Sequence, residues 1–129
     1  MEKSPLSSNS NASINPSSKE SNASDLFSKQ ELERYNRHII IPEFGKDAQA
    51  RLKNSKVLVV GSGGLGSPML LYLAAAGVGT IGIIDFDKVE DSNLQRQVLF
   101  DTEDIGIPKV EAAERKLKAM NPFINIEVY

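Results

Sequence analysis

The sequence predicts an α/β fold, the first half of a Rossmann-like, doubly wound parallel sheet with about three strands. Three observations predict it. Two short, β-branched apolar runs lie at Lys56–Val60 and Thr80–Asp85. A glycine-rich turn follows the first run directly, and helix-like stretches separate the runs. Because the order is strand, helix, strand, helix, strand, we expect parallel strands joined by right-handed crossovers.

Length and composition limit the possible functions. The chain has 129 residues, 40% hydrophobic and 25% charged, which suits one domain and is too short for two. With 15 basic and 17 acidic residues the net charge is -2, so we expect neither nucleic acid nor a membrane as partner. The lack of cysteine excludes disulfides, thiolate nucleophiles and cysteine-bound zinc within this chain. No apolar run approaches the roughly 20 residues of a membrane-spanning helix.

The N-terminal residues differ in composition from the rest. Residues 1–24 hold nine Ser and four Asn but few large apolar side chains, too little to offset the entropy of ordering. We therefore expect residues 1–28 to form a disordered Ser/Asn-rich tail and residues 29–129 to form the domain. No apolar core of a secretion signal is present near the start, so a cytoplasmic location is expected.

Each ordered element has a local reason. Ser28 and Glu31 have the spacing of a capping box, which predicts a short helix through Tyr35 or Asn36. The apolar run at Lys56–Val60 predicts a strand that is buried on both faces. The remaining expected elements are a short helix at Lys46–Lys53, a helix at Pro68–Ala76 that ends at Gly77, a strand at Thr80–Asp85, a helix at Pro108–Met120 and a strand at Ile124–Tyr129.

A glycine motif indicates a nucleotide site. Gly61-Ser62-Gly63-Gly64-Leu65-Gly66 follows the first strand and opens a helix, the context in which G-x-G-x-x-G binds phosphate. Glycine permits close backbone approach, and a helix start offers free N–H groups. Asp85 ends the second strand, where a carboxylate accepts hydrogen bonds from ribose hydroxyls. The alternatives are a tight turn without a ligand and a capping role for Asp85. These residues alone favour a nicotinamide or flavin enzyme.

Polar residues after Asp85 favour a longer phosphate chain. Arg96 suits bidentate phosphate binding, Asn93 and Gln95 can orient the oxygens, and Lys109 adds a positive charge at the second long helix. Together with Arg37, three cations can converge on one ligand. Two phosphates of a dinucleotide do not need so many, whereas a triphosphate does. The alternative is that each cation is a solvated surface charge.

Six motifs, in order and spacing, resemble the N-terminal part of the MoeB/ThiF/HesA superfamily, bacterial relatives of ubiquitin-activating enzymes. The resemblance covers residues 29–129. The motifs are Arg34-Tyr35-Asn36-Arg37-His38-Ile39-Ile40, Gly61-Ser62-Gly63-Gly64-Leu65-Gly66-Ser67, Ala76-Gly77-Val78-Gly79, Asp85-Phe86-Asp87, Ser92-Asn93-Leu94-Gln95-Arg96-Gln97 and Gly106-Ile107-Pro108-Lys109-Val110.

The resemblance implies an adenylyltransferase. Such an enzyme uses ATP with Mg²⁺ to adenylate the C-terminal glycine carboxylate of a small ubiquitin-fold sulfur-carrier protein, and it works as a homodimer. Arg37 would then reach the γ-phosphate in the partner subunit, Asp85 would hold the ribose, and Arg96 and Lys109 would bind phosphates. The expected catalytic residues are Arg96, Lys109 and Arg37, and the expected nucleotide-binding residues are Gly61, Gly63, Gly64, Gly66, Asp85, Asp87, Ser92, Asn93, Gln95, Arg96 and Lys109.

Other family features fall outside this sequence. The family's magnesium ligand, carrier groove, zinc-binding cysteine pairs and acceptor cysteine would follow Tyr129, so we expect a fragment that binds ATP weakly, if at all, and does not turn over alone. The alternative is a natural half-domain that completes itself with another chain. Zinc is expected only in a longer form. Two other functions stay open: an NAD(P)-binding oxidoreductase fragment and a non-catalytic nucleotide-binding or dimerisation module. The resemblance leaves open whether the carrier serves molybdopterin, thiamine or another pathway.

Overall fold

The computed structural model describes residues 26–129 and divides between Ala50 and Arg51 into two compact units. Most of the predicted tail, residues 1–25, lies outside the described residues. None of the helices in the described part is long and apolar enough to cross a membrane.

The N-terminal unit begins with the predicted capping box. Helix α2 spans Lys29–Arg34. The Ser28 hydroxyl accepts a hydrogen bond from the Glu31 amide (3.1 Å), and the Glu31 carboxylate accepts one from the Ser28 amide (2.9 Å). Phe27, which we expected to belong to the tail, is buried, and its ring meets Tyr35 edge to face with 6.5 Å between centroids. The capping box is therefore confirmed, and an apolar contact accompanies it.

Two further helices complete this unit. Helix α3 spans Asn36–Ile39 and α4 spans Gly45–Lys53. We expected two helices in this unit, and α3 is an additional short one directly after α2. His38 lies 2.9 Å from Gln49 (Nδ1 to Oε1), and its ring packs against Phe44 with 5.3 Å between centroids. This histidine therefore packs within the helical unit, where an apolar and a polar neighbour hold its ring.

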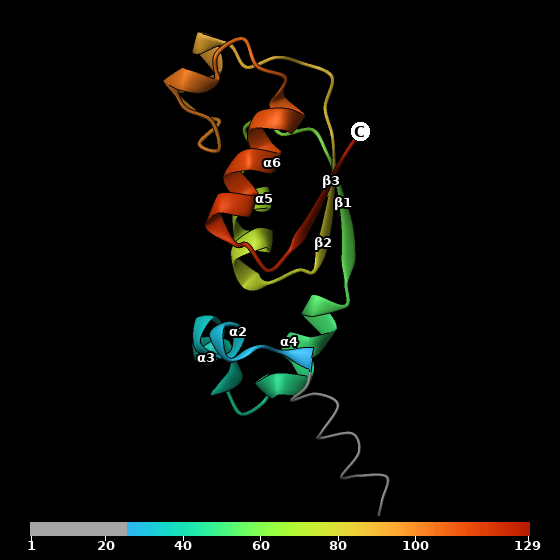
Figure 1. Ribbon diagram of the computed structural model, residues 1–129. Coiled ribbons are helices and arrows are strands. Elements are labelled where there is room, and N and C mark those ends of the chain that lie inside the picture. Colours follow the sequence, from blue (N-terminus) through green and yellow to red (C-terminus); the bar gives the residue numbers. More distant parts are fainter. Residues whose placement is uncertain (1–25) are drawn as a thin grey trace, which may run out of the picture. The chain divides into compact units, whose positions relative to one another are not determined.

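The C-terminal unit is a three-stranded parallel sheet with two helices over one face (Figure 1). The strand order is β1-β2-β3, so each helix connects neighbouring strands by a crossover. This confirms the predicted Rossmann-like α/β arrangement, and every boundary lies within two residues of the expected one. The elements are β1 (Lys56–Val60), α5 (Gly66–Ala76), β2 (Thr80–Ile84), α6 (Lys109–Met120) and β3 (Asn125–Val128).

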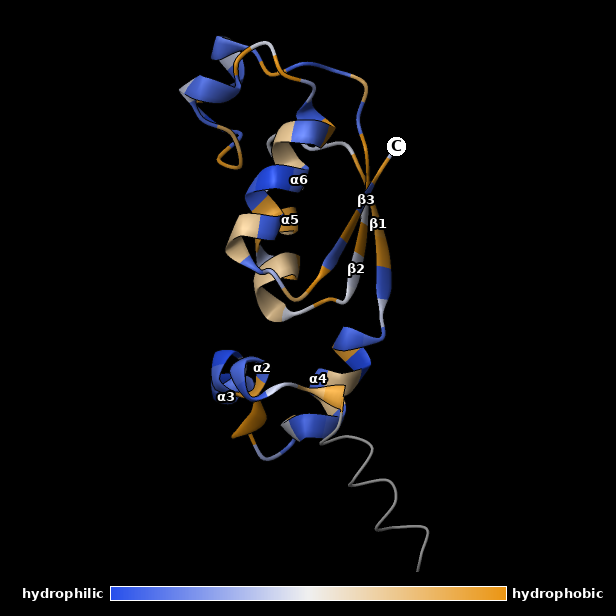
Figure 2. Cartoon of the chain, in the orientation of Figure 1, coloured by the Kyte–Doolittle hydropathy of each residue, from blue (hydrophilic) through white to orange (hydrophobic). Residues whose placement is uncertain are grey.

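The core of this unit lies between the sheet and the two helices. Ile81 and Ile83 of β2, Leu70 of α5 and Leu117 of α6 are completely buried there. Full burial of such a side chain contributes about 1.5–3 kcal/mol. Figure 2 shows hydrophobic stretches along the strands, whereas the short helical turns between β2 and α6 are hydrophilic. This core fixes the ends of β1 and β2, from which the glycine loop and Asp85 emerge.

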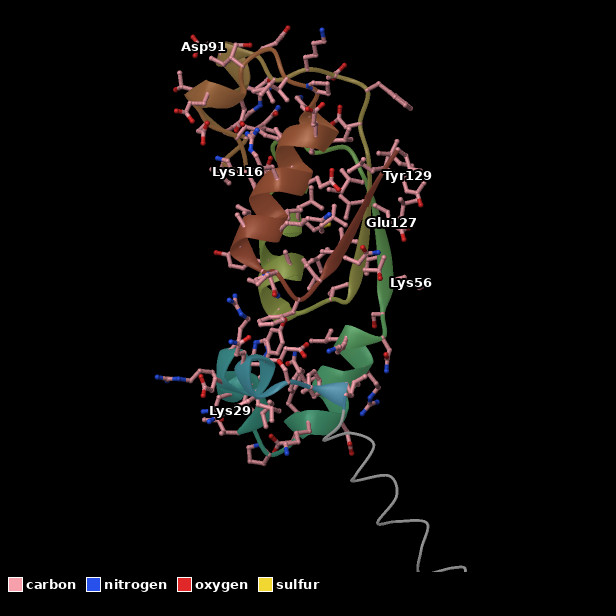
Figure 3. The ribbon with its side chains drawn as sticks, in the orientation of Figure 1. Lys29, Lys56, Asp91, Lys116, Glu127 and Tyr129 are labelled. Carbon is pink, nitrogen blue, oxygen red and sulfur yellow. The ribbon has the colours of Figure 1, made fainter. Side chains whose placement is uncertain are left out.

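The other face of the sheet corrects one prediction. We expected Lys56–Val60 to be buried on both faces, but Leu58 is 56% and Val60 74% exposed. Both crossovers step in the same direction with the same hand, so α5 and α6 cover the same face. Lys56, Glu127 and Tyr129 lie on the face away from the helices (Figure 3), where a groove of about 380 Å³ runs over Gly82.

A long polar segment connects β2 to α6 and is anchored on α6. It contains two short 3-10 turns, η1 (Asp91–Asn93) and η2 (Thr102–Asp104). The completely buried Asp104 carboxylate accepts a hydrogen bond from the Asp101 amide (2.9 Å) and pairs with Arg115 and Lys116 of α6. A buried carboxylate needs such partners. The anchoring holds the segment that carries Arg96.

Candidate functional site

The glycine loop turns tightly between β1 and α5. Gly61 has a φ of 89°, which suits glycine, and its amide donates to the Ile84 carbonyl of β2 (2.7 Å). A Cβ at Gly66 would overlap the carbonyl oxygen of Gly61. The Ser67 hydroxyl donates to the Ser62 carbonyl (2.9 Å) across the turn. The loop is therefore closed at both ends, and only glycine fits at its last position.

The middle of this loop presents free donors. The amides of Gly63, Gly64 and Gly66 donate no hydrogen bond to any acceptor among residues 26–129. Gly63 and Gly64 precede the 11-residue helix α5 and Gly66 begins it, so the helix dipole adds positive potential here. Several free N–H groups at such a helix start match the acceptor oxygens of a phosphate group. The loop therefore has the donors that phosphate binding requires.

Asp85 is held against this loop at the end of β2. Its Oδ2 accepts hydrogen bonds from the Ser62 amide (2.8 Å) and hydroxyl (2.9 Å), and its Oδ1 accepts one from the Asp87 amide (2.9 Å). Two carboxylate oxygens offer about four acceptor positions. The position left on Oδ1 can therefore accept a ribose hydroxyl.

These contacts keep Asp85 ionised. Burial, the largest single influence, acts to raise the pKa of Asp85. The hydrogen bonds from Asp87 and Ser62 and the charge of Lys109 together outweigh it, so the pKa of Asp85 lies below its ordinary value. Lys109 is 6% exposed, and its amide donates to the Asp87 carbonyl (2.9 Å). The start of α6 therefore brings a buried cation to the ends of β1 and β2.

Arg96 is brought to the glycine loop by the segment after β2. Its side chain lies against Gly64, where a Cβ would be 3.6 Å from Arg96 Cδ. The guanidinium is exposed, and its Nη1 donates to the Ser92 carbonyl (3.2 Å). Most of its donors are thus left for an anion beside the loop.

Other expected site residues have different surroundings. The Asn93 side chain is buried, and its Oδ1 accepts from the Glu90 amide (2.9 Å), so this oxygen caps η1. Ser92 and Gln95 are exposed, with Gln95 Nε2 3.5 Å from the Ser92 carbonyl. Arg37 is an exposed residue of α3 in the N-terminal unit. The site that the C-terminal unit assembles directly thus consists of the glycine loop, Asp85, Asp87, Arg96 and Lys109.

Sequence reasoning missed two residues of this site. Ser62 holds the Asp85 carboxylate through two hydrogen bonds. Gln97 is 3% exposed, and its Nε2 lies 3.7 Å from the position of a Cβ on Gly63. Ser62 lies inside the glycine motif and Gln97 directly follows Arg96. Their positions in these two motifs are the sequence signal that could have identified them as site residues.

Residues 26–129 contain groups that suit the phosphates and the ribose of ATP. Free loop amides, Arg96 and Lys109 suit phosphate oxygens, and the remaining acceptor position of Asp85 suits a ribose hydroxyl. No group of three or more His, Cys, Asp or Glu side chains within residues 26–129 could hold a metal ion. The expected magnesium ligand after Tyr129 stays a prediction.

The Ser62 hydroxyl gives a direct test of the Asp85 environment. In the Ser62→Ala variant we expect the pKa of Asp85 to rise, because a hydrogen bond to the charged form is lost. A depressed pKa contributes stability above the unfolded value, and that stability is lost as the pH falls through the folded value. In the variant this contribution should therefore be smaller, and its loss should be complete at a higher pH. NMR titration of the Asp85 carboxyl carbon measures the shift, and an unchanged pKa would contradict the assigned role of the hydroxyl.

Comparison with known proteins decides the family. The ThiF family model matches residues 35–129, most of the chain. The chain belongs to the ThiF family. The probable adenylyltransferase/sulfurtransferase MoeZ of Mycobacterium tuberculosis is 57% identical over 103 residues, 80% of this chain and 26% of MoeZ. The sulfur carrier protein adenylyltransferase of Thermus thermophilus is 52% identical over 103 residues, 80% of this chain and 38% of that protein.

A solved structure supports the same ThiF-type fold. The crystal structure of Escherichia coli MccB with ATP matches this chain with a TM-score of 0.62 and 42% sequence identity. The match covers 63% of this chain and 24% of the MccB chain. This chain spans 26% of MoeZ and 38% of the Thermus protein. The similarity therefore establishes the family and the fold of this segment, which contains the glycine loop, Asp85, Arg96 and Lys109.

Proposed function

We propose that this chain supplies the nucleotide-binding part of an enzyme that adenylates the C-terminal glycine carboxylate of a ubiquitin-fold sulfur-carrier protein. One observation carries the proposal: the free amides of the glycine loop lie between a carboxylate, Asp85, and a guanidinium, Arg96. Two relatives support it, since one is named a sulfur carrier protein adenylyltransferase and MccB has been crystallised with ATP.

The proposed reaction needs positioning and positive charge. A carboxylate oxygen of the carrier bonds to the α-phosphorus, the bond from that phosphorus to the α–β bridging oxygen breaks, and pyrophosphate leaves with the electron pair. No proton moves, so no protein base is required. Two anions must approach, and Arg96 and Lys109 reduce their repulsion. Each such cation is worth about 2–4 kcal/mol of transition-state stabilisation. Bound Mg²⁺ would neutralise further phosphate charge.

Asp85 and the glycine loop have the binding roles in this proposal. The loop amides donate to phosphate oxygens and Asp85 accepts from a ribose hydroxyl, which places the α-phosphorus near Arg96. Arg37 belongs to the proposal as a cation that a second subunit of a homodimer contributes to the γ-phosphate. The Arg37 contribution predicts that activity depends on dimer formation.

A segment exchange tests the proposal. Residues 26–129 would replace the matching segment of the Thermus protein, with which they share 52% identity over 103 residues. We expect the chimera to exchange labelled pyrophosphate into ATP only when its carrier protein is present. ATP binding without exchange would favour a non-catalytic module, and NADH binding in place of ATP binding would favour an oxidoreductase fragment. Either result would contradict the proposal.

A further inference from the structure

Gln97 has an unpaired acceptor beside the glycine loop. Its Oε1 is the one buried side-chain nitrogen or oxygen in the described part of the chain that has no hydrogen-bond partner. A buried unpaired acceptor costs on the order of 1–3 kcal/mol, and native proteins retain few of them. This one lies in a residue that is only 3% exposed. The atom therefore calls for an explanation in terms of function.

The position of Gln97 is fixed by its own backbone. Its amide donates to the Asn93 carbonyl (2.8 Å), and its carbonyl accepts from the Phe100 amide (3.1 Å). Phe100 and the neighbouring Leu99 belong to the core. The Gln97 backbone is therefore held on both sides, and any adjustment between Gln97 and the loop falls on the loop or on the Gln97 side-chain torsions.

Matching donors lie in the loop that the Gln97 side chain approaches. The amide end of Gln97 approaches Gly63, at 3.7 Å from Nε2 to the position of a Cβ. The Gly63 and Gly64 amides donate to no acceptor within residues 26–129. The Gln97 side-chain amide, whose Oε1 is unpaired, thus lies beside Gly63, whose backbone amide donates to no acceptor in the described residues. A small movement of the loop, or a rotation of the Gln97 amide, could pair them.

We propose that Gln97 is a positioning residue for the nucleotide loop. Its Oε1 accepts a hydrogen bond from the Gly63 amide when a phosphate occupies the loop, and this bond holds the amides of Gly64 and Gly66 where they donate to phosphate oxygens. The inference rests on the proposed nucleotide binding. The inference adds that the unpaired Gln97 Oε1 destabilises the nucleotide-free state and that nucleotide binding removes this destabilisation.

This proposal predicts opposite changes in stability and affinity for Gln97→Met. Methionine preserves the length of the side chain but removes the buried polar atoms. The melting temperature of the free chain should rise by about 4 °C, because an unpaired acceptor is lost. ATP binding should weaken about 5- to 10-fold, the worth of one neutral hydrogen bond. A purely structural role for Gln97 would lower both quantities.

The full 129-residue chain, labelled with ¹⁵N, provides the measurement. NMR titration with ATP gives the dissociation constant even for weak binding and reports the side-chain amide of Gln97. We expect the Gln97 side-chain and Gly63 backbone signals to shift with ATP in the unsubstituted chain, so this test does not depend on how the variant folds. Gln30→Met, at an exposed position of α2, should leave the melting temperature and ATP affinity unchanged.

Titration with inorganic tripolyphosphate separates the loop from the sugar. If Gln97 acts through the loop, Gln97→Met should weaken tripolyphosphate and ATP binding by the same factor. Weakening of ATP binding alone would mean that Gln97 contacts the nucleoside, and it would overturn the positioning role. Equal ATP affinity of the variant and the unsubstituted chain would overturn this inference alone. No ATP-dependent shifts of Gln97 and Gly63 in the unsubstituted chain would also overturn this inference, whereas the proposed function is tested separately by pyrophosphate exchange in the chimera.

Discussion

Arg96→Ala is expected to reduce carrier-dependent pyrophosphate exchange by the chimera about 30- to 1,000-fold, the kinetic equivalent of about 2–4 kcal/mol. The reason is that the Arg96 guanidinium lies beside the glycine loop and neutralises charge where two anions meet. Its side chain is exposed, so the fold should be unaffected. Exchange assays combined with circular dichroism separate the loss of activity from a loss of structure.

Arg51→Ala is the matched control for this substitution. Arg51 is also exposed, but it lies at the end of α4 and not beside the loop. We expect the control to retain exchange activity and stability. Unimpaired exchange in Arg96→Ala would refute the assignment of Arg96 to the reaction, and equal losses in both variants would indicate a general effect of removing surface charge.

Gly66→Ala should destabilise the C-terminal unit by about 2–4 kcal/mol and abolish ATP binding, because the added Cβ would overlap the Gly61 carbonyl and force the loop backbone to move. A loss of that size lowers the melting temperature of a domain of this length by roughly 10 °C or more. Thermal unfolding followed by circular dichroism measures the first effect, and NMR titration with ATP measures the second.

Gly64→Ala tests whether the effect at Gly66 depends on position. A Cβ at Gly64 would meet only the Arg96 side chain, at 3.6–3.9 Å, which is ordinary contact. We therefore expect Gly64→Ala to fold with nearly the stability of the unsubstituted chain. Equal destabilisation of the two variants would show that backbone flexibility, and not the close approach to Gly61, explains the glycine at position 66.

The sequence was informative where a local pattern has one physical outcome. The capping box at Ser28 and Glu31 forms as predicted, because both partners lie within one helical turn. The apolar runs at 56–60 and 80–84 form neighbouring parallel strands, and Gly77 ends α5 with a φ of 95°. These outcomes depend on residues close in sequence, which is why composition and spacing predict them.

The surroundings of single side chains depended on the tertiary structure. The apolar run Lys56–Val60 does not reveal how many of its faces are covered, because that depends on the side over which later crossovers return. The Oδ1 of Asn93 caps a turn, which its place in the motif did not reveal, and its expected contact with phosphate stays a prediction. Ser62 looked like a loop residue, but it donates twice to Asp85 across 23 positions.

The family and the order of the elements could be predicted from six motifs in a fixed order and from hydrophobic runs with strand and helix spacing. Which loop donors stay free, and which acceptor is buried without a partner, depends on the tertiary structure. Such facts depend on distances between segments far apart in the chain, as between Gly63 and Gln97. Spacing along the sequence does not give those distances, because they arise only when the core brings the ends of β1 and β2 together.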